Sequence, residues 1–165
     1  MDTVQDQNPE DGSMSSGNGT FMALTFELRG ERFAVEVANV HEVIDPLPLT
    51  TVPNADPFAP GLINARGAVV PVLNLQYRFG MAQTEQTQDT RFVVLETELD
   101  DDKTKFAMIA DSVHEVVEID EATIQPAPEL GLKWPPEHIR GIAEKDDRLL
   151  IFLNTESIFR PSLVA

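Results

Sequence analysis

The chain contains no cysteine, and aromatic polar residues are scarce, with one tryptophan and one tyrosine among 165 residues. The absence of cysteine excludes disulfides, thiolate metal sites and a thiol nucleophile, and it fits a reducing compartment. Apolar runs are only a few residues long, far short of the ~20 that span a bilayer. The opening Met-Asp-Thr-Val has neither a basic nor an apolar leader pattern, so we expect neither export nor membrane insertion.

Positive charge is also scarce, and the formal net charge is −16. Such a chain should repel nucleic acid and anionic membranes. The charge is uneven, because residues 20–81 carry six acids and four bases, whereas residues 91–165 carry sixteen acids and eight bases. For most of these acids the simplest interpretation is a solvated surface that keeps the protein soluble.

What the chain does contain is an internal repeat. The tetrapeptide Val-His-Glu-Val at 40–43 recurs at 113–116, an offset of 73. Further matches at an offset of 80 are Gly61 with Gly141, Leu73-Asn74 with Leu153-Asn154, and Phe79 with Phe159. The chain is one module written twice, and function should be sought where the two copies differ.

Short alternating runs separated by Gly and Pro turns indicate an all-β fold with little helix. Residues 22–28 and 33–37 predict one hairpin, and residues 61–65 and 68–75 predict another with its turn at Arg66-Gly67. About five strands in each copy would form two small closed or nearly closed barrels, which hide their edges.

Three segments carry special expectations. Apolar residues of 37–44 recur at helical spacing and predict a short helix that Pro46 ends. The repeat of this segment, Val113–Val117, is expected to be helical or bent. Pro71 cannot donate to a ladder, so its strand is expected to be an edge or to carry a bulge.

The predicted domain organisation has two parts. Residues 1–19 carry four acids and no base, have almost nothing to bury, and are expected to form a disordered acidic tail. Residues 20–165 form one domain, with a first lobe at about 20–81, a connector at 82–90 and a second lobe at about 91–165.

No catalytic or metal-binding constellation is evident. His41 and His114 stand at equivalent positions in the repeat, which favours a structural role, and no His-x-x-x-His pair exists. Asp100–Asp102 lacks the Gly and Glu of a calcium loop and predicts a solvated hairpin tip. There is no phosphate-binding Gly loop and no Gly-x-Ser-x-Gly. We therefore predict a protein that is not an enzyme and needs no cofactor or metal.

Arg66 is the difference between the copies that stands out. The second copy has Asp146-Asp147 where the first has Arg66-Gly67, so the shared fold does not require arginine at this turn. Two interpretations stay open: an ordinary exposed turn arginine, or a binding residue beside Glu42 and the proline-rich loop that follows it.

The stretch Gly61–Leu75, which reads Gly-Leu-Ile-Asn-Ala-Arg-Gly-Ala-Val-Val-Pro-Val-Leu-Asn-Leu, resembles the signature of the CheW family of chemotaxis coupling proteins. The resemblance extends to Phe33–Val43, Ala122–Glu129 and Arg148–Asn154, and it covers about residues 20 to 160. It implies a CheW-like fold, two SH3-like five-stranded β-barrel subdomains that share a hydrophobic interface, with short helices. The chain departs from the family pattern at two positions, Ala65 for a usual leucine and Asn74 for a usual aspartate.

The resemblance implies a non-catalytic, cytoplasmic scaffold that links chemoreceptor tips to the CheW-like regulatory domain of the histidine kinase CheA. Adaptors of pilus-based motility or of other chemosensory pathways are an alternative. The matching receptor-binding residues are Glu42, Gly61, Asn64 and Arg66, and we place the kinase contact on exposed apolar side chains at Val69 and Pro71.

Two further expectations concern partners. Because the lobes share a fold but differ in charge, we expect head-to-tail contacts between the first lobe of one molecule and the second lobe of the next. Rival classes are a small nucleic-acid-binding barrel, against which the charge of −16 argues, and an enzyme with an unrecognised site.

Overall fold

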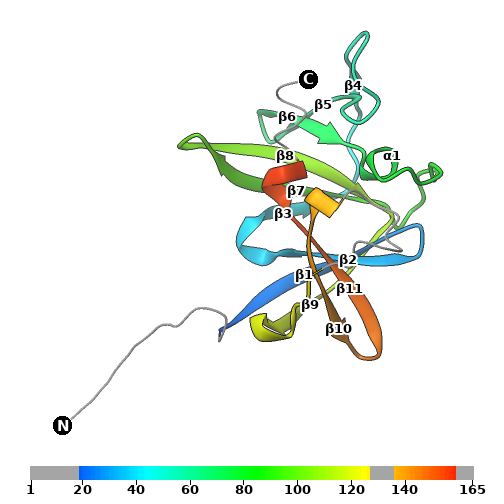
Figure 1. The fold of residues 1–165 in the computed structure, drawn as a ribbon. Coiled ribbons are helices and arrows are strands. Elements are labelled where there is room, and N and C mark those ends of the chain that lie inside the picture. Colours follow the sequence, from blue (N-terminus) through cyan, green and yellow to red (C-terminus); the bar gives the residue numbers. More distant parts are fainter. Residues whose placement is uncertain (1–18, 127–135, 159–165) are drawn as a thin grey trace.

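A computed structural model describes residues 19–126 and 136–158, except the side chains of Leu99 and Pro136 (Figure 1). Of the predicted tail, residues 1–18 lie outside the described residues. The strands are β1 (Thr20–Leu28), β2 (Glu31–Glu36), β3 (Val40–Ile44), β4 (Thr50–Thr51), β5 (Gly61–Ala65), β6 (Ala68–Leu73), β7 (Arg91–Leu99), β8 (Asp102–Ala110), β9 (Ser112–Asp120), β10 (Ile139–Lys145) and β11 (Arg148–Leu153). The helical turns are η2 (Val37–Asn39), α1 (Leu75–Arg78), η3 (Glu121–Thr123) and η4 (Pro136–His138), and residues 155–158 are also helical.

The strands form two sheets, one above the other in Figure 1. One has the order β10-β11-β2-β1-β9 and the other the order β3-β7-β8-β6-β5-β4. Each sheet contains one parallel pair, β11 with β2 and β6 with β8, and its other neighbours are antiparallel. The predicted all-β fold of two SH3-like units is confirmed.

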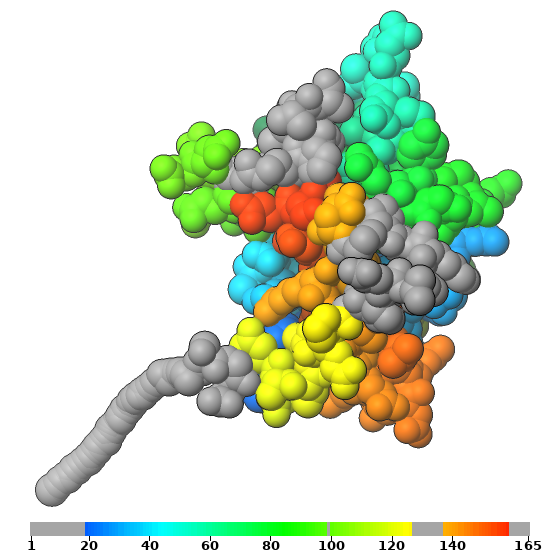
Figure 2. All heavy atoms as spheres, in the orientation of Figure 1, coloured from blue at the N-terminus to red at the C-terminus, as the bar shows by residue number. Residues whose placement is uncertain are grey.

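The two sheets do not follow the two halves of the sequence. The first hairpin of each copy, β1–β2 or β7–β8, lies in the sheet that the rest of the other copy forms. Figure 2 shows the consequence on the surface, where residues near the N-terminus (blue) share the lower half with the C-terminal hairpin (orange). The predicted lobes, 20–81 and 91–165, therefore do not coincide with the sheets. The cause is the long-range parallel pairing of β2 with β11, about which local alternation contains no information.

Three groups of buried side chains fill the molecule. The group between the sheets takes large residues from both, including Phe26, Phe33, Phe106 and Met108. We call the unit formed by the sheet β3-β7-β8-β6-β5-β4 the β3–β8 barrel, and the unit formed by the sheet β10-β11-β2-β1-β9 the β1–β9 barrel. A smaller group lies inside the β3–β8 barrel (Ile63, Ala65, Val70, Val72, Phe92, Val94, Ala107). Another lies inside the β1–β9 barrel (Ala23, Ala34, Ile119, Ala143, Leu150, Phe152). Each buried phenylalanine ring contributes about 1.5–3 kcal/mol of transfer free energy. The expected hydrophobic interface between the barrels is thus present.

The segment 37–44 is mostly strand, and the prediction of a helix there was wrong. Only Val37–Asn39 form a 3-10 turn, and β3 then pairs with β7 with a register shift between Val40 and Glu42. In the second copy β9 also shifts, opposite Leu24–Phe26, so the bent alternative for this segment is correct and the helical one is wrong. The extra residue of a bulge breaks the period of two, and this break resembled helical spacing.

Two-residue turns connect four hairpins, as the sequence predicted for Arg66-Gly67. Both turn residues have positive φ at Arg29-Gly30, Arg66-Gly67, Asp100-Asp101 and Asp146-Asp147. This conformation matches the type I′ turn, whose twist fits a β-hairpin. Pro71 pairs only with Leu62 of β5, because the ladder between β6 and β8 begins at Val72. Its part of β6 is locally an edge, as expected, although β6 as a whole lies inside the sheet.

The repeated glycines Gly61 and Gly141 allow close approach of a neighbouring strand. A Cβ at Gly61 would collide with the carbonyl oxygen of Thr50, and one at Gly141 would lie 2.9 Å from the carbonyl oxygen of Gln125. We expect Gly61→Ala to lower the free energy of unfolding by about 1–3 kcal/mol, because a backbone atom has to move. Urea titration followed by circular dichroism measures this loss. Gly19→Ala is the control, since nothing lies within 4 Å of that position, and equal stability of the two variants would contradict this role.

His138 occupies the place that Phe58 has in the first copy. Both side chains are only 1% exposed, and both backbone carbonyls accept a hydrogen bond from an asparagine N–H, that of Asn154 or Asn74. The Nδ1 of His138 lies 2.9 Å from Ser157 Oγ, while its buried Nε2 has no partner. Burial lowers the pKa of His138, Arg78 lowers it further, and Glu137 partly opposes the shift.

A lowered pKa in the folded state makes stability depend on pH. Below about pH 6.5 the unfolded chain binds a proton at this histidine more readily than the folded chain, so the free energy of unfolding falls as the pH falls. We expect His138→Phe to remove most of the difference in urea midpoint between pH 7.5 and pH 5.5, and to raise the midpoint at both. The same pH difference in the variant would contradict this assignment. His41→Ala, at an exposed position, serves as the control.

Candidate functional site

The β5–β6 hairpin has one face buried in the barrel and one face exposed to solvent. On its inner face Ile63, Ala65 and Val70 are buried inside the barrel. Its outer face alternates with the inner one and bears Leu62, Asn64, Val69 and Pro71, which form the cross-strand pairs Asn64 with Val69 and Leu62 with Pro71. The Arg66-Gly67 turn ends this hairpin, so the predicted arginine and the predicted apolar residues lie on one element.

Arg66 in the β5–β6 turn and Glu42 in β3 form an ion pair. The Arg66 Nε lies 3.1 Å from Glu42 Oε1, and the Arg66 side chain is 80% exposed against 19% for Glu42. His41 Nε2 lies 4.0 Å from the other carboxylate oxygen of Glu42. A pair with so exposed a partner contributes at most about 1 kcal/mol to stability. We infer that the half-buried carboxylate orients the guanidinium and leaves much of it open to solvent.

Asn64 holds the turn on which Arg66 lies. Its Oδ1 accepts a hydrogen bond from the Gly67 N–H at 2.9 Å. Arg66 itself has φ of 55°, a left-handed conformation that is uncommon for residues other than Gly, Asn and Asp. The second copy places an aspartate, Asp146, in the same conformation. Arg29 of the β1–β2 turn also has this conformation, so the backbone neither requires nor excludes arginine at position 66.

The ion pair is a property of the first copy only. Glu115 repeats Glu42, but Asp146 stands where Arg66 stands. Both acids line a small cavity together with Arg32, Lys145 and Arg148. The structure thus brings Glu42, Asn64 and Arg66 together, as the sequence predicted for Glu42 and Arg66. It does not bring Gly61 to them, because Gly61 is buried at the opposite end of β5, roughly 16 Å along an extended strand.

The predicted kinase-facing residues differ in exposure. Val69 is 68% exposed, the highest value among the exposed large apolar residues described, and Pro71 is half-buried. Sequence reasoning missed Leu149, which is 62% exposed and repeats Val69 at an offset of 80. Val43 and Val116 are a second exposed pair at equivalent positions. Comparison of the two copies at the offsets of the repeat could have identified Leu149 and the pair Val43 and Val116.

Of the two departures from the family pattern, Asn74 has a local explanation and Ala65 has none. Asn74 caps α1, since its Oδ1 accepts from the Tyr77 N–H at 3.2 Å, and Asn154 accepts from Ser157 N–H in the same way at 3.1 Å. Asparagine caps a helix about as well as aspartate does. Ala65 is 7% exposed and faces the barrel interior.

Other polar groups do not form a catalytic arrangement in the described ranges. His114 Nε2 lies 3.0 Å from Glu27 Oε1, and this hydrogen bond is the main cause that lowers the pKa of Glu27. Within residues 19–126 and 136–158 no three His, Cys, Asp or Glu side chains could hold a metal ion. In those same residues no helix is long and apolar enough to cross a membrane.

The described structure is thus a pair of SH3-like units with an exposed arginine turn. A family model described as a CheW-like domain matches residues 22–162. The chain is 27% identical over 147 residues to the probable chemotaxis protein CheW of Rhizobium etli, which covers 89% of this chain and 91% of the relative. It is 30% identical over 135 residues to the chemotaxis protein CheW of Helicobacter pylori, which covers 82% and 79%.

The fold comparison agrees. The crystal structure of the scaffolding protein TtCheW from Thermoanaerobacter tengcongensis matches with a TM-score of 0.77 and 31% identity, over 86% of this chain and 88% of that one. The chain belongs to the CheW family of chemotaxis adaptor proteins.

Proposed function

We propose that this protein is a non-catalytic cytoplasmic scaffold that couples chemoreceptor tips to a CheA-type histidine kinase. The observation that carries the proposal is the Arg66–Glu42 pair on a left-handed turn of the first copy, which the second copy lacks. Membership of the CheW family supplies the class of partners.

The receptor contact is proposed at the polar end of the β5–β6 hairpin. Arg66 would donate to carbonyl or carboxylate groups of the receptor tip, and Glu42 and Asn64 would hold the arginine and its turn in place. Gly61 would act indirectly, because it is buried and permits the approach of β4.

The kinase contact is proposed on the apolar outer face of the same hairpin. Val69 offers an exposed apolar side chain, and Pro71 lies one position further along the same face. An apolar centre with charges at its rim is typical of specific protein contacts, and the charges mainly set the encounter rate and orientation.

The test is binding of the purified protein to the CheA-type kinase of the same cell, measured by isothermal titration calorimetry with the kinase's CheW-like regulatory domain. Receptor-containing membranes are added in a second step, and the protein that sediments with them is measured with and without kinase. Binding to both partners supports the proposal. Absence of binding to the kinase domain and to the membranes would rule it out.

A further inference from the structure

The repeat gives each residue of one barrel an equivalent residue in the other barrel. At one end of the barrels these equivalent residues differ. At this end of the β1–β9 barrel, Arg140 forms ion pairs with Glu36 and Glu121, and its guanidinium lies 5.0 Å from the centre of the Phe21 ring. Phe21 in turn packs edge-on against Phe152, with ring centres 5.6 Å apart. An aromatic pair and a bridging arginine therefore close this end.

Equivalent positions of the other barrel carry none of these groups. Ile109 pairs with Phe92 as Glu36 pairs with Ala23, so Ile109 stands in the place of Glu36. By the offsets of the repeat, Pro48 replaces Glu121 and Pro60 replaces Arg140. Thr90, two residues before Phe92, stands where Phe21 precedes Ala23. Each group that closes one barrel is thus apolar or smaller in the other.

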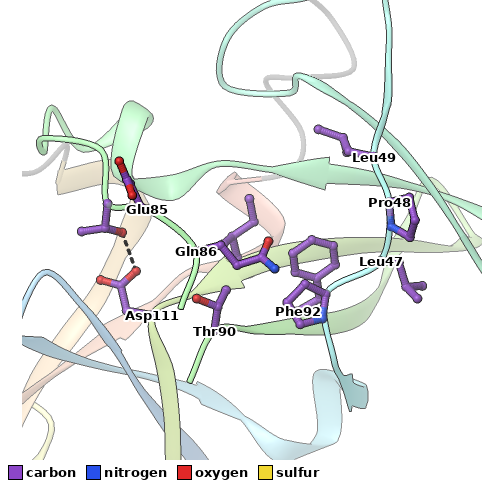
Figure 3. A pocket seen from close by; sticks show the side chains of 11 residues that line it. Leu47, Pro48, Leu49, Glu85, Gln86, Thr90, Phe92 and Asp111 are labelled. Carbon is purple, nitrogen blue, oxygen red and sulfur yellow. Dashed lines mark hydrogen bonds between the residues drawn. The ribbon is translucent and has the colours of Figure 1, made fainter. Parts of the chain in front are cut away.

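An open pocket of about 500 Å³ occupies the equivalent end of the β3–β8 barrel. The residues before β4 and the connector line opposite sides, and Phe92 and Thr90 lie between them (Figure 3). The lining is Pro46, Leu47, Pro48, Leu49, Thr84, Glu85, Gln86, Thr90, Phe92, Ile109 and Asp111. This volume lies within the range of ligand sites, which is about 300–1,000 Å³.

The connector wall of the pocket is held rigidly. Gln76, which is 5% exposed, exchanges hydrogen bonds with Thr84, donating from Nε2 at 2.8 Å and accepting from the Thr84 N–H at 2.9 Å. Asp111 Oδ1 accepts from Thr84 Oγ1 at 2.7 Å and from Gln76 Nε2 at 2.9 Å. At the other end of the connector, buried Thr90 accepts from the Thr87 N–H at 2.8 Å. Glu85 and Gln86 are held between these two anchors.

The charge of the lining selects one kind of occupant. Its eleven described residues include two carboxylates, Glu85 and Asp111, and no basic side chain. Asp111 already accepts three hydrogen bonds, the third from the Arg29 N–H at 2.8 Å, whereas Glu85 is exposed at the rim. The apolar side chains of Leu47 and Leu49 lie on the opposite side, and Phe92 lies between the two sides.

We propose that this pocket binds a segment of a partner protein in which an apolar side chain stands next to a lysine or arginine. The apolar side chain enters against Phe92 and Leu49, and the cation lies at Glu85. The inference goes beyond the proposed coupling function, because the pocket contains none of the residues assigned there to receptor or kinase. Its test uses neither partner.

The test is a titration of the isotope-labelled full chain, followed by NMR, with three blocked dipeptides. These are acetyl-Phe-Lys-amide, acetyl-Phe-Glu-amide and acetyl-Gly-Lys-amide. Acetyl-Phe-Lys-amide should shift the amide signals of Thr90, Phe92 and Ile109, and should bind about threefold to fivefold more tightly than acetyl-Phe-Glu-amide, the effect of one exposed ion pair. Acetyl-Gly-Lys-amide should give no saturable shift.

Matched variants separate the two parts of the site. Glu85→Gln should abolish the preference for the lysine peptide over the glutamate peptide. Leu49→Ala should lower the affinity for both phenylalanine peptides about threefold. Both positions are exposed, so the fold is expected to survive, and the amide spectrum reports on this directly. Glu144→Gln and Leu149→Ala, exposed positions of the other barrel, are the controls and should change nothing. Equal binding of the lysine and glutamate peptides, shifts outside the pocket, or no effect of Glu85→Gln would overturn the proposal.

Discussion

Replacing Arg66 with alanine is expected to leave the fold intact and to weaken binding to receptor-containing membranes roughly thirtyfold. That factor corresponds to a loss of about 2 kcal/mol in binding free energy, which is typical when an arginine at the centre of a contact is removed. The stability cost should stay below about 0.5 kcal/mol, because the side chain is 80% exposed and its ion pair is weak in water. Co-sedimentation measures the binding, and urea titration measures the stability.

Two variants of the same design test the specificity of this effect. Arg29 has the same residue type in the same left-handed turn position, with φ of 52° against 55° for Arg66, so Arg29→Ala controls for loss of a turn arginine. Arg66→Asp introduces the residue type that the second copy has at this turn, and the fold accepts it there. Both Arg66 variants should lose receptor binding while Arg29→Ala retains it. An unfolded Arg66→Ala protein would show a structural role, and unchanged binding would show that Arg66 is incidental.

Replacing Val69 with aspartate is expected to reduce the affinity for the kinase regulatory domain at least about tenfold. A carboxylate placed in an apolar contact must lose its hydration without a partner, which costs more than 1.4 kcal/mol. The fold should be unaffected, because Val69 is 68% exposed on the outer face of β6. Titration calorimetry at 0.1 M and 0.5 M NaCl compares this loss with the effect of salt, which we expect to be smaller.

Leu149→Asp is the matched control for Val69→Asp. Leu149 is 62% exposed and holds the equivalent position of the other barrel, so the added charge and the strand context are the same. If Leu149→Asp reduces kinase binding more than Val69→Asp does, the contact belongs to the β10–β11 face. If salt abolishes binding while neither variant matters, the contact is electrostatic and the apolar interpretation fails.

Local patterns were reliable where neighbouring residues decide the structure. The β1–β2 and β5–β6 hairpins lie where alternation predicted them, and the second has the predicted turn at Arg66-Gly67, because a two-residue turn sets its own register. β7 lies between β3 and β8, with Val93 facing one core and Val94 the other. The strand at 40–44 was misread, since a bulge at the repeated His-Glu step breaks the alternation.

The sequence by itself determined the duplication, the all-β class and the family, and it singled out Arg66 as a candidate binding residue, since each rests on residue identity or on spacing along the chain. The sequence also predicted that Arg66 lies beside Glu42, and the two residues form an ion pair. Only the tertiary structure decided that the first hairpins of the two copies exchange sheets. The parallel pairs β2–β11 and β6–β8 join distant segments, and no local preference selects such partners. Only the structure, again, showed one barrel end closed by Arg140 and the other left open, because that contrast depends on side chains from four separate segments meeting in space.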